Sequence, residues 1–223
     1  MEALSNDMVL TKNQLAYRRI RNAIQDGTLK PGERLVISTL SSKLGMSPIP
    51  IREAISQLAR EGLLALRPHA GAVVSDIPLH AIEEIFALLE SLEIAAVRLA
   101  LPRLTDASVR SLDALCEQME STQDVPEWAK LNRRFHELIP DLAGLDRVRE
   151  FLVRVGEDWE RLRKLRFPDS YSEDISEANR QHREFVELLR AGRLLPVEKW
   201  IREHNRHALR KYKEVAESRD ESG

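Results

Sequence analysis

The sequence predicts a mainly α-helical chain in two parts: an N-terminal winged helix-turn-helix and a C-terminal antiparallel all-helical bundle of about six helices. Two observations lead to this prediction. In residues 35–74, two helical patterns flank a glycine turn, and two short strand patterns follow them. Beyond residue 78, every periodic segment has apolar residues at helical spacing, and proline or glycine separates one segment from the next.

The first expected helix spans residues 13–26, where apolar side chains recur at helical spacing. Gly27 ends this helix, and Pro31-Gly32 forms a turn before the next one. The residues expected to face the core from this helix are Ala16, Ile20, Ala23 and Ile24.

The next two helices form the helix-turn-helix pair. Ser38 is expected to be the N-cap of the second helix, which ends in a tight turn at Gly45. Ser47 is expected to cap the third helix, and Pro48 suits its first position because that N–H has no helical partner. Gly62 is expected to end the third helix with a positive φ.

The wing is expected to be a short hairpin that follows the third helix. Its two strands span residues 64–67 and 72–75, on either side of a tip that runs from His69 to Gly71. The segment Asp76-Ile-Pro78 reads as a linker. The predicted domains are therefore 10–76 and 79–216.

The second part contains six expected helices joined by short loops, which is typical of an antiparallel bundle. Their expected spans are 80–100, 106–121, 126–139, 146–167, 173–191 and 196–216. The breakers expected between them are Pro102, Pro126, Pro140 with Gly144, Pro168, and Gly192 with Pro196.

The composition indicates a globular protein, because 43% of its 223 residues are hydrophobic. Residues 1–76 hold 10 Lys and Arg against 7 Asp and Glu, a net charge of +3, and the remaining residues hold 24 against 29, a net charge of −5. This contrast suits a DNA-binding module joined to a domain with another partner. Cys116 is the single cysteine, which excludes an intramolecular disulfide. The chain has neither a long apolar run nor a signal-peptide pattern, so we expect a cytoplasmic protein without a membrane segment.

Three histidines lie on the apolar faces of separate predicted helices. His136 follows Asn132 by one helical turn, so both side chains point to the same side. His182 and His204 lie within the apolar stripes of two later helices. Imidazole is a common ligand of Zn²⁺ and Ni²⁺, and three such ligands leave room for water or an effector. On spacing alone, hydrogen-bonded core histidines are an equal alternative to a metal site.

Four spaced motifs occur in order through the first part of the chain. They are Gly27-x-x-x-Pro31-Gly32-x-x-Leu35, Leu44-Gly45-x-Ser47-x-x-Pro50-x-Arg52-Glu53-Ala54, Leu58-x-x-Glu61-Gly62-Leu63 and Arg67-Pro68-His69-x-Gly71. This series resembles the DNA-binding domain of GntR-family transcription regulators. The resemblance implies a recognition helix that enters the major groove of double-stranded operator DNA. The DNA-contacting residues that it implies are Ser47, Arg52, Arg67, His69 and Gly71.

The second part carries a matching resemblance. Asn132-x-x-x-His136, then His182, then His204 resemble the metal-binding pattern of the FCD domain, the C-terminal ligand-binding domain of the FadR subfamily. The resemblance implies a divalent metal ion, Zn or Ni, with Asn132, His136, His182 and His204 as ligands. It also implies a small organic-acid effector that binds at the metal site through its carboxylate, and a homodimer. His207, three residues after His204, is the next candidate ligand.

The chain departs from the family pattern at four positions. Asn132 stands where the family usually has Asp, so this ligand brings no negative charge. Leu89 stands where the family often has an arginine that contacts the effector. Pro48 and Ser38 stand where the family often has base-reading arginines, so a relative's operator sequence cannot be transferred. Other arginines available for the effector contact are Arg98, Arg133 and Arg163.

The expected function is that of a transcription regulator, a repressor whose operator binding is controlled by the effector, and not that of an enzyme. Two alternatives stay open: a metal-free regulator whose histidines bind the effector directly, and a helical metalloenzyme fused to a DNA-binding domain. Against the second alternative, the sequence has neither the paired Glu-x-x-His motifs of a di-iron bundle nor a His-Glu-x-x-His motif.

Overall fold

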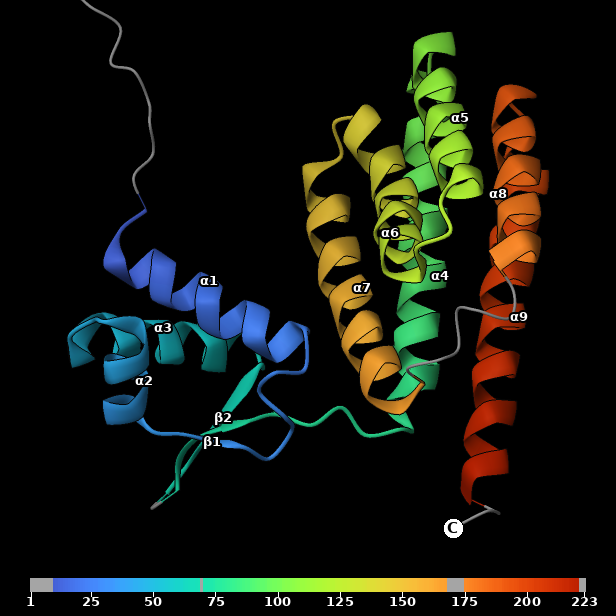
Figure 1. Cartoon of the computed structure of the whole chain (residues 1–223). Helices are drawn as coiled ribbons and strands as arrows, with labels where there is room; N and C mark the ends of the chain where they lie inside the picture. Colours follow the sequence, from blue (N-terminus) through green and yellow to red (C-terminus); the bar gives the residue numbers. More distant parts are fainter. Residues whose placement is uncertain (1–9, 69, 168–174, 221–223) are drawn as a thin grey trace, which may run out of the picture. The chain divides into compact units, whose positions relative to one another are not determined.

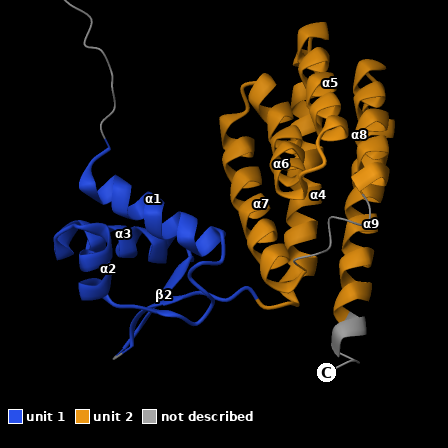
Figure 2. Ribbon diagram, viewed as in Figure 1, with its two compact units in different colours: residues 1–77 blue, residues 78–223 orange. Residues whose placement is uncertain are grey.

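The computed structural model describes residues 10–68, 70–167 and 175–220, and these residues are mainly helical (Figure 1). The chain divides into two compact units, one extending to Ile77 and the other beginning at Pro78 (Figure 2). The first unit combines helices with a small sheet, and the described part of the second unit is helical. None of the described helices is long and apolar enough to span a bilayer.

In the first unit, helices pack beside a small antiparallel sheet. The helices are α1 (Lys12–Gln25), α2 (Ile37–Leu44) and α3 (Pro48–Arg60), and the strands are β1 (Arg34–Leu35), β2 (Leu64–Arg67) and β3 (Gly71–Val74). The strands lie in the order β1-β3-β2. The apolar faces of α1 and α3 meet in the core, whose buried residues include Ala16, Ile20, Ile24, Ile51 and Leu58.

The predicted N-cap of the second helix is wrong. α2 begins at Ile37, and Val36 is its N-cap. The carbonyl of Val36 accepts a hydrogen bond from the Leu40 N–H at 3.0 Å, so Ser38 already lies within the first turn. The physical reason is that pairing in the sheet holds the backbone extended up to Leu35, and the helix starts directly after the strand.

The turn between α2 and α3 confirms the role predicted for Gly45. Gly45 is the C-cap of α2 and has a φ of 65°, a left-handed conformation that other residues rarely adopt. Ser47 is the N-cap of α3 and Pro48 is its first residue, as predicted. The Ser47 side chain makes no capping hydrogen bond, so its hydroxyl is not used to hold the helix end. Gly62, after α3, has the predicted positive φ, 79°.

Strands β2 and β3 form the predicted wing hairpin, with Arg67 opposite Gly71 next to its tip. The sequence did not predict β1, whose Arg34 pairs with Val73 of β3. A two-residue strand is too short to show a recognisable alternation of apolar and polar residues. The tip residue with a predicted role, His69, lies outside the described residues.

The second unit contains the predicted helices, and their observed spans agree with the predicted ones to within a few residues. They are α4 (Ala81–Ala100), the short 3-10 turn η1 (Leu101–Arg103), α5 (Asp106–Ser121), α6 (Val125–Leu142), α7 (Asp146–Arg166), α8 (Ile175–Arg190) and α9 (Leu194–Asp220). α8 corresponds to the helix predicted over residues 173–191. Residues 173 and 174 lie outside the described part of the chain.

Three prolines that were predicted to separate helices lie within helices, and one of them, Pro126, is in the first turn of α6. Pro196 lies in the first turn of α9, where a missing N–H costs nothing. Pro140 lies near the end of α6, two residues before the helix ends at Leu142. Its carbonyl accepts a hydrogen bond from the Leu145 N–H at 2.8 Å, so the chain turns immediately after the helix.

Helix α4 is central to the bundle, because it contacts α6, α7 and α9. α5 packs against α6 and α8, and α8 packs against α9. Figure 1 shows these helices running alongside one another. Side chains from several helices that are distant in sequence therefore meet in one interior.

We expect Gly45→Ala to lower the free energy of unfolding of the first unit by about 1–2 kcal/mol, because alanine is strained in the left-handed region. No atom lies within 4 Å of the position that a Cβ would occupy, so a steric clash is not part of this effect. Gly45→Asn is the matched control and should cost less, since asparagine tolerates that conformation. Urea unfolding followed by circular dichroism measures both losses, and equal losses would contradict the explanation.

Candidate functional site

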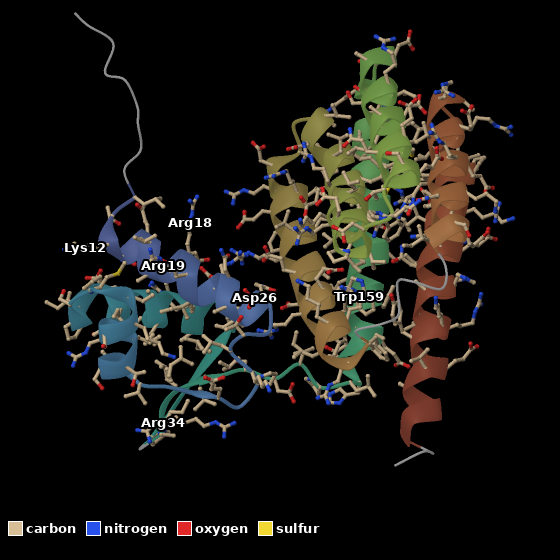
Figure 3. The ribbon with its side chains drawn as sticks, in the orientation of Figure 1. Lys12, Arg18, Arg19, Asp26, Arg34 and Trp159 are labelled. Carbon is tan, nitrogen blue, oxygen red and sulfur yellow. The ribbon has the colours of Figure 1, made fainter. Side chains whose placement is uncertain are left out.

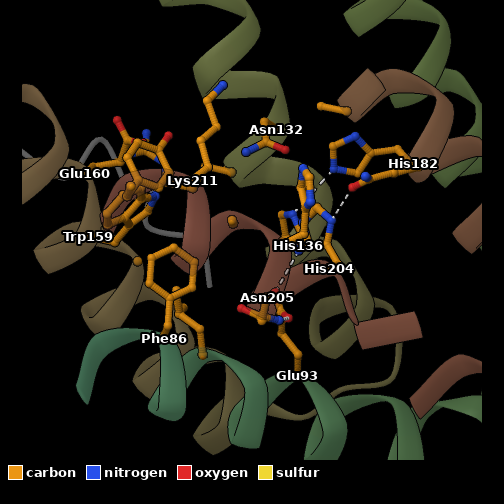
Figure 4. A pocket seen from close by; sticks show the side chains of 18 of the residues that line it. Phe86, Glu93, Asn132, His136, Trp159, Glu160, His182, His204, Asn205 and Lys211 are labelled. Carbon is orange, nitrogen blue, oxygen red and sulfur yellow. Dashed lines mark hydrogen bonds and ion pairs between the residues drawn. The ribbon is translucent and has the colours of Figure 1, made fainter. Parts of the chain in front are cut away.

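Three histidines from three helices meet inside the second unit (Figure 4). His136 lies on α6, His182 on α8 and His204 on α9. One ring nitrogen of each lies within 4.8 Å of the corresponding nitrogens of the other two. The Nε2 atoms of His136 and His182 are 3.5 Å apart. The structure therefore brings together the three histidines that the sequence placed on separate apolar faces.

A carboxylate from α4 holds the outer side of one ring. Nδ1 of His136 lies 2.8 Å from Oε1 of Glu93. The other carboxylate oxygen accepts a hydrogen bond from Nδ2 of Asn205, on α9, at 2.7 Å. The Glu93 side chain is only 12% exposed. This carboxylate therefore links α4, α6 and α9 at the back of the histidine cluster.

The other two rings also face oxygen atoms on their outer sides. Nδ1 of His204 lies 2.7 Å from Oε1 of Gln181. The orientation of the Gln181 amide is fixed, because its Nε2 donates to a carboxylate oxygen of Glu177 at 2.8 Å. His182 is completely buried. Its Nδ1 faces the backbone carbonyl of Ala178, one turn earlier on α8, in a contact that falls short of a regular hydrogen bond.

These contacts decide which nitrogen of each neutral ring carries the hydrogen. Carboxylate and amide oxygens accept hydrogen bonds, so Nδ1 is the donor in His136 and His204. Nδ1 of His182 makes no regular hydrogen bond, and its weaker contact with the backbone of Ala178 favours the same tautomer, so that each Nε2 presents a lone pair. Three lone pairs therefore converge in the interior. Acceptors that face one another repel, and a buried polar atom without a partner is costly. A cation at the point of convergence removes both penalties, so the residues present fit a metal ion.

Burial favours the neutral, metal-binding form of two rings. It lowers the pKa of His182 well below its usual range, and the neighbouring imidazoles of His136 and His204 lower it further. Burial also lowers the pKa of His204 to about 4, with a further contribution from His136. For Glu93, burial raises the pKa, but the charges and hydrogen bonds of His136, His204 and Asn205 together bring it below its usual value.

The donor set favours particular metals. Three imidazole nitrogens suit Zn²⁺ or Ni²⁺, whereas Mg²⁺ and Ca²⁺ prefer oxygen ligands. Metal–nitrogen bonds of about 2.0–2.1 Å place neighbouring ligand atoms roughly 3 Å apart. The distance of 3.5 Å between Nε2 of His136 and Nε2 of His182 is close to that separation. Metal-binding histidines usually donate their other N–H to a carboxylate or carbonyl, which is the arrangement found for these rings.

The histidines form part of the wall of a cavity of about 170 Å³, to which α4, α6, α7, α8 and α9 all contribute. Asn132, the fourth predicted ligand, lines this cavity one turn before His136 (Figure 4). His207 also lines the cavity but does not join the three-histidine group. The choice of His204 over His207 therefore agrees with the positions of the two side chains.

The three arginines considered for an effector contact differ in whether they line the cavity. Arg133 lines the cavity. Arg98 instead pairs with a glutamate of α9, at 2.6 Å, and Arg163 is buried in an ion pair with Glu160 at 3.2 Å. Leu89, which replaces the family's arginine, lines the cavity with an apolar side chain. Arg133 also pairs with Glu137, at 3.8 Å, but of these candidate arginines it is the one that lines the cavity.

Sequence reasoning missed the side chains that hold the histidines, namely Glu93, Gln181 and Asn205. For Glu93 the sequence did contain a signal. It lies at helical spacing within a row of α4 residues that are otherwise apolar and buried: Ile85, Leu89 and Val97. A carboxylate in such a row needs a buried partner, so it marks a polar site.

In the first unit, the predicted recognition helix α3 and the wing border one hollow on the surface. Arg52 from α3 lines this hollow together with Arg67 and Gly71 from the wing. Within the described residues, neither arginine forms an ion pair. Ser47 is exposed at the start of α3, and His69 lies outside the described residues.

Arg34 also lines this hollow and was missed by the sequence analysis. It lies on β1, and pairing with β3 brings it to the wing (Figure 3). Arginines from a helix, a wing strand and an unpredicted third strand therefore surround one surface. Such a concentration of guanidinium groups attracts the phosphate backbone of nucleic acid.

A winged helix with an arginine-lined hollow, joined to a separate helical unit, is the architecture of a DNA-binding transcription regulator. Comparison with known families identifies the particular group. Residues 12–74 match the family described as bacterial regulatory proteins, gntR family, and residues 84–207 match the FCD domain. The chain belongs to the GntR family and carries an FCD domain, which confirms the resemblance seen in its motifs. It is a transcription regulator and not an enzyme.

Individual relatives agree with this assignment. The chain is 28% identical over 212 residues to the HTH-type transcriptional regulator YdhC of Bacillus subtilis (strain 168), covering 92% of this chain and 93% of YdhC. It is 35% identical over 162 residues to the Nta operon transcriptional regulator of Aminobacter aminovorans, covering 72% of this chain and 75% of the relative. A solved structure of a GntR transcriptional regulator from Rhodococcus sp. RHA1 has a similar fold, with a TM-score of 0.73 and 21% identity over 91% of this chain and 97% of that chain.

Proposed function

We propose that this protein is a homodimeric, cytoplasmic repressor that binds double-stranded operator DNA and responds to a small carboxylate effector. Residues 10–76 bind DNA, and residues 79–216 bind the effector beside a divalent metal ion, Zn or Ni. The ligands of that ion are His136, His182, His204 and Asn132. The observation that carries this proposal is the convergence of three imidazole lone pairs on the wall of a cavity.

The residues at the cavity wall have different roles in binding an anion. A divalent ion at the histidines supplies positive charge for a carboxylate oxygen. Asn132 is a neutral ligand, so it leaves more of that charge for the effector than an aspartate would. Glu93 orients the His136 ring. Arg133, three residues before His136 and at the cavity wall, adds a second positive charge.

The DNA-binding roles follow from where each side chain lies. Arg52 is exposed near the start of α3, the part of a recognition helix that contacts base edges. Arg34 and Arg67 lie on strands beside it, where they meet phosphates. The free hydroxyl of Ser47 and the N-terminus of α3 suit another phosphate. Gly71, with a φ of 75°, lets the wing backbone come close to DNA. His69, two residues earlier in the sequence, is the other wing residue to which we assign a DNA contact.

The dimer places two recognition helices on two half-sites. A face of α4 provides the surface for it. Leu88 and Leu99 are 52% and 48% exposed although both are large apolar residues. Leu92 and Ala95 lie between them, and the spacing of four, three and four residues puts all four on one stripe. We assign this stripe to the contact between two copies of the chain.

We expect Arg52→Ala to weaken binding to a selected pseudo-palindromic duplex by about 1–3 kcal/mol, because it removes a base contact. Arg34→Ala and Arg67→Ala should instead weaken selected and random duplexes equally, and each should reduce the salt slope by about 1. Arg110→Ala, which removes an exposed charge from α5, is the matched control. Fluorescence anisotropy at several salt concentrations measures all four variants. An Arg52→Ala protein that binds every selected duplex like the parent would show that α3 does not read the bases.

We expect about one Zn or Ni ion per chain after purification without chelator, and a melting temperature that falls when a chelator is added. His182→Ala should lower both the metal content and the response to effector, while the first unit stays folded. His80→Ala, at an exposed histidine outside the cavity, is the matched control. Mass spectrometry of bound metal and differential scanning fluorimetry measure these effects.

The same measurements separate the metal-dependent regulator from the metal-free alternative. Protein that carries no stoichiometric metal, and whose melting temperature ignores added Zn and Ni, would rule out the metal site. If a carboxylate still bound in the cavity of such protein, and His182→Ala abolished that binding, the histidines would contact the effector themselves.

A further inference from the structure

We propose that the effector is a monocarboxylate with one flat aromatic ring, an acid of the benzoate type. This inference rests on the proposed function, because it assumes that the carboxylate binds beside the histidines. The observation behind it is that the cavity has two chemically different ends. One end carries the histidine cluster, and the other is built from aromatic and aliphatic side chains (Figure 4).

Three aromatic rings from three helices form the apolar end. Phe86 comes from α4, Trp159 from α7 and Tyr212 from α9, and all three line the cavity. The ring centroids of Phe86 and Trp159 are 4.9 Å apart at an interplanar angle of 63°. Those of Trp159 and Tyr212 are 4.5 Å apart at 72°. The three rings form one aromatic cluster at the cavity wall, and a further ring can pack against such a cluster in the same edge-to-face or offset geometry.

The size and the remaining apolar lining agree with a single ring. Leu89 and Leu152 are buried and also line the cavity. Leu89 occupies the position where the family often has an arginine, so the chain has an apolar side chain where a second anionic group would find its partner. The volume of about 170 Å³ is similar to that of the cavity of about 150 Å³ that holds benzene in an engineered protein.

The charges at the cavity wall disfavour an effector with two carboxylates. Glu137 and Glu160 line the cavity, and Glu160 lies near Trp159 at the aromatic end (Figure 4). Glu137 is paired with Arg133 at 3.8 Å and Glu160 with Arg163 at 3.2 Å. A second carboxylate placed beside Glu160 would compete with it for Arg163. The positive side chains of the lining are Arg133 and Lys211. Arg133 lies on the same helix as His136, one turn away, so it serves the same end as the histidines.

The test uses the full-length protein loaded with one equivalent of zinc, and isothermal titration calorimetry with benzoate, acetate and succinate. We expect benzoate to bind at least roughly tenfold more tightly than acetate or succinate, since the ring adds a large buried apolar area. Trp159→Ala should weaken benzoate binding by about tenfold and leave acetate binding and zinc content unchanged.

Three further variants separate an aromatic contact from damage to the fold. Trp159→Phe keeps a ring at this position and should retain most of the benzoate affinity. Phe151→Ala removes an exposed phenylalanine, 53% accessible, from the same helix and should change nothing. Leu89→Arg should shift the preference from benzoate toward succinate. Circular dichroism and zinc content establish that each variant is folded and loaded.

The outcomes distinguish this inference from the proposed function. Succinate binding as tightly as benzoate, or a Trp159→Ala protein that binds benzoate like the parent, overturns the aromatic assignment while the carboxylate effector stands. Zinc-loaded protein that binds none of the three acids overturns both. Benzoate binding that is lost in Trp159→Ala, retained in Trp159→Phe and abolished by removing zinc supports both.

A second observation, in the first unit, concerns operator sequence. Ile49 lies in the first turn of α3 and is 67% exposed, although it is a large apolar residue. It precedes Arg52 by three residues, so the two side chains share one face of the helix. We infer that Ile49 reads the 5-methyl group of a thymine in the operator.

The chemistry of the major groove supports this choice of partner. The thymine methyl is the apolar group that base pairs present there, beside hydrogen-bond donors and acceptors. Residues at the N-terminal end of a recognition helix are the ones that contact base edges. Pro48 and Ile49 carry no side-chain donor, so this first turn can distinguish bases by apolar contact alone. An exposed isoleucine is unfavourable in water and gains from covering a methyl group.

A thymine-to-deoxyuridine exchange tests this contact, because it removes the methyl group and nothing else. In a duplex selected from a random pool, each thymine is replaced in turn, and binding is measured by anisotropy. We expect a loss of several-fold at one position in each half-site. Ile49→Ala should abolish the difference between thymine and uracil at that position, and Ile49→Val should keep most of it.

A control and two contrary results complete this test. Leu195→Ala removes an exposed leucine, 78% accessible, from α9 and should preserve every thymine preference. If no thymine position is sensitive to the exchange, or if Ile49→Ala keeps the full difference, then Ile49 does not read the methyl group.

Discussion

The interior of the second unit depends on one constraint: three imidazoles, one completely buried and two partly buried, point their lone pairs at one place. That arrangement is stable only if the outer nitrogens are held and the inner ones have a partner. Glu93, Gln181 and the backbone of Ala178 face the outer nitrogens. Because these groups come from α4 and α8 while the rings lie on α6, α8 and α9, the polar cluster ties together four helices that also form the hydrophobic core.

The aromatic contacts around the cluster explain why the rings keep their orientation. Phe135 is completely buried and meets the His182 ring edge-on, with centroids 4.6 Å apart. Trp200 stacks on His204 with centroids 4.7 Å apart and planes only 9° from parallel. Each imidazole therefore has an oxygen atom at one nitrogen and an aromatic ring at its face or edge. Little rotation is left, so the Nε2 atoms are preorganised for a ligand.

The sequence predicted what local patterns determine and missed what distant pairings determine. The spacing of apolar residues along the chain predicted the helices of the second unit. It also predicted the helix faces on which His136, His182 and His204 lie, and the structure agrees with both predictions. Arg34 was missed because its place beside the wing depends on pairing with β3, which no local pattern reveals. The place of Glu93 in an apolar row was visible in the sequence, but its partners on α6 and α9 were not. The prediction of Ser38 as an N-cap was wrong for the same reason, because the pairing of β1 with β3 determines where α2 begins.

Helix α4 unites the three tasks that the proposed function requires. Phe86, Leu89 and Glu93 line the cavity from one face of this helix. The partly exposed stripe that contains Leu88 and Leu99 lies on another face. The N-terminus of α4 follows β3 of the wing after only six residues, 75–80. Under the proposed function, a ligand that moves or stiffens α4 would act both on the dimer contact and on the segment that joins α4 to the DNA-binding unit. Effector binding and dimerisation would then be coupled through one helix, which is the physical connection that control of operator binding requires.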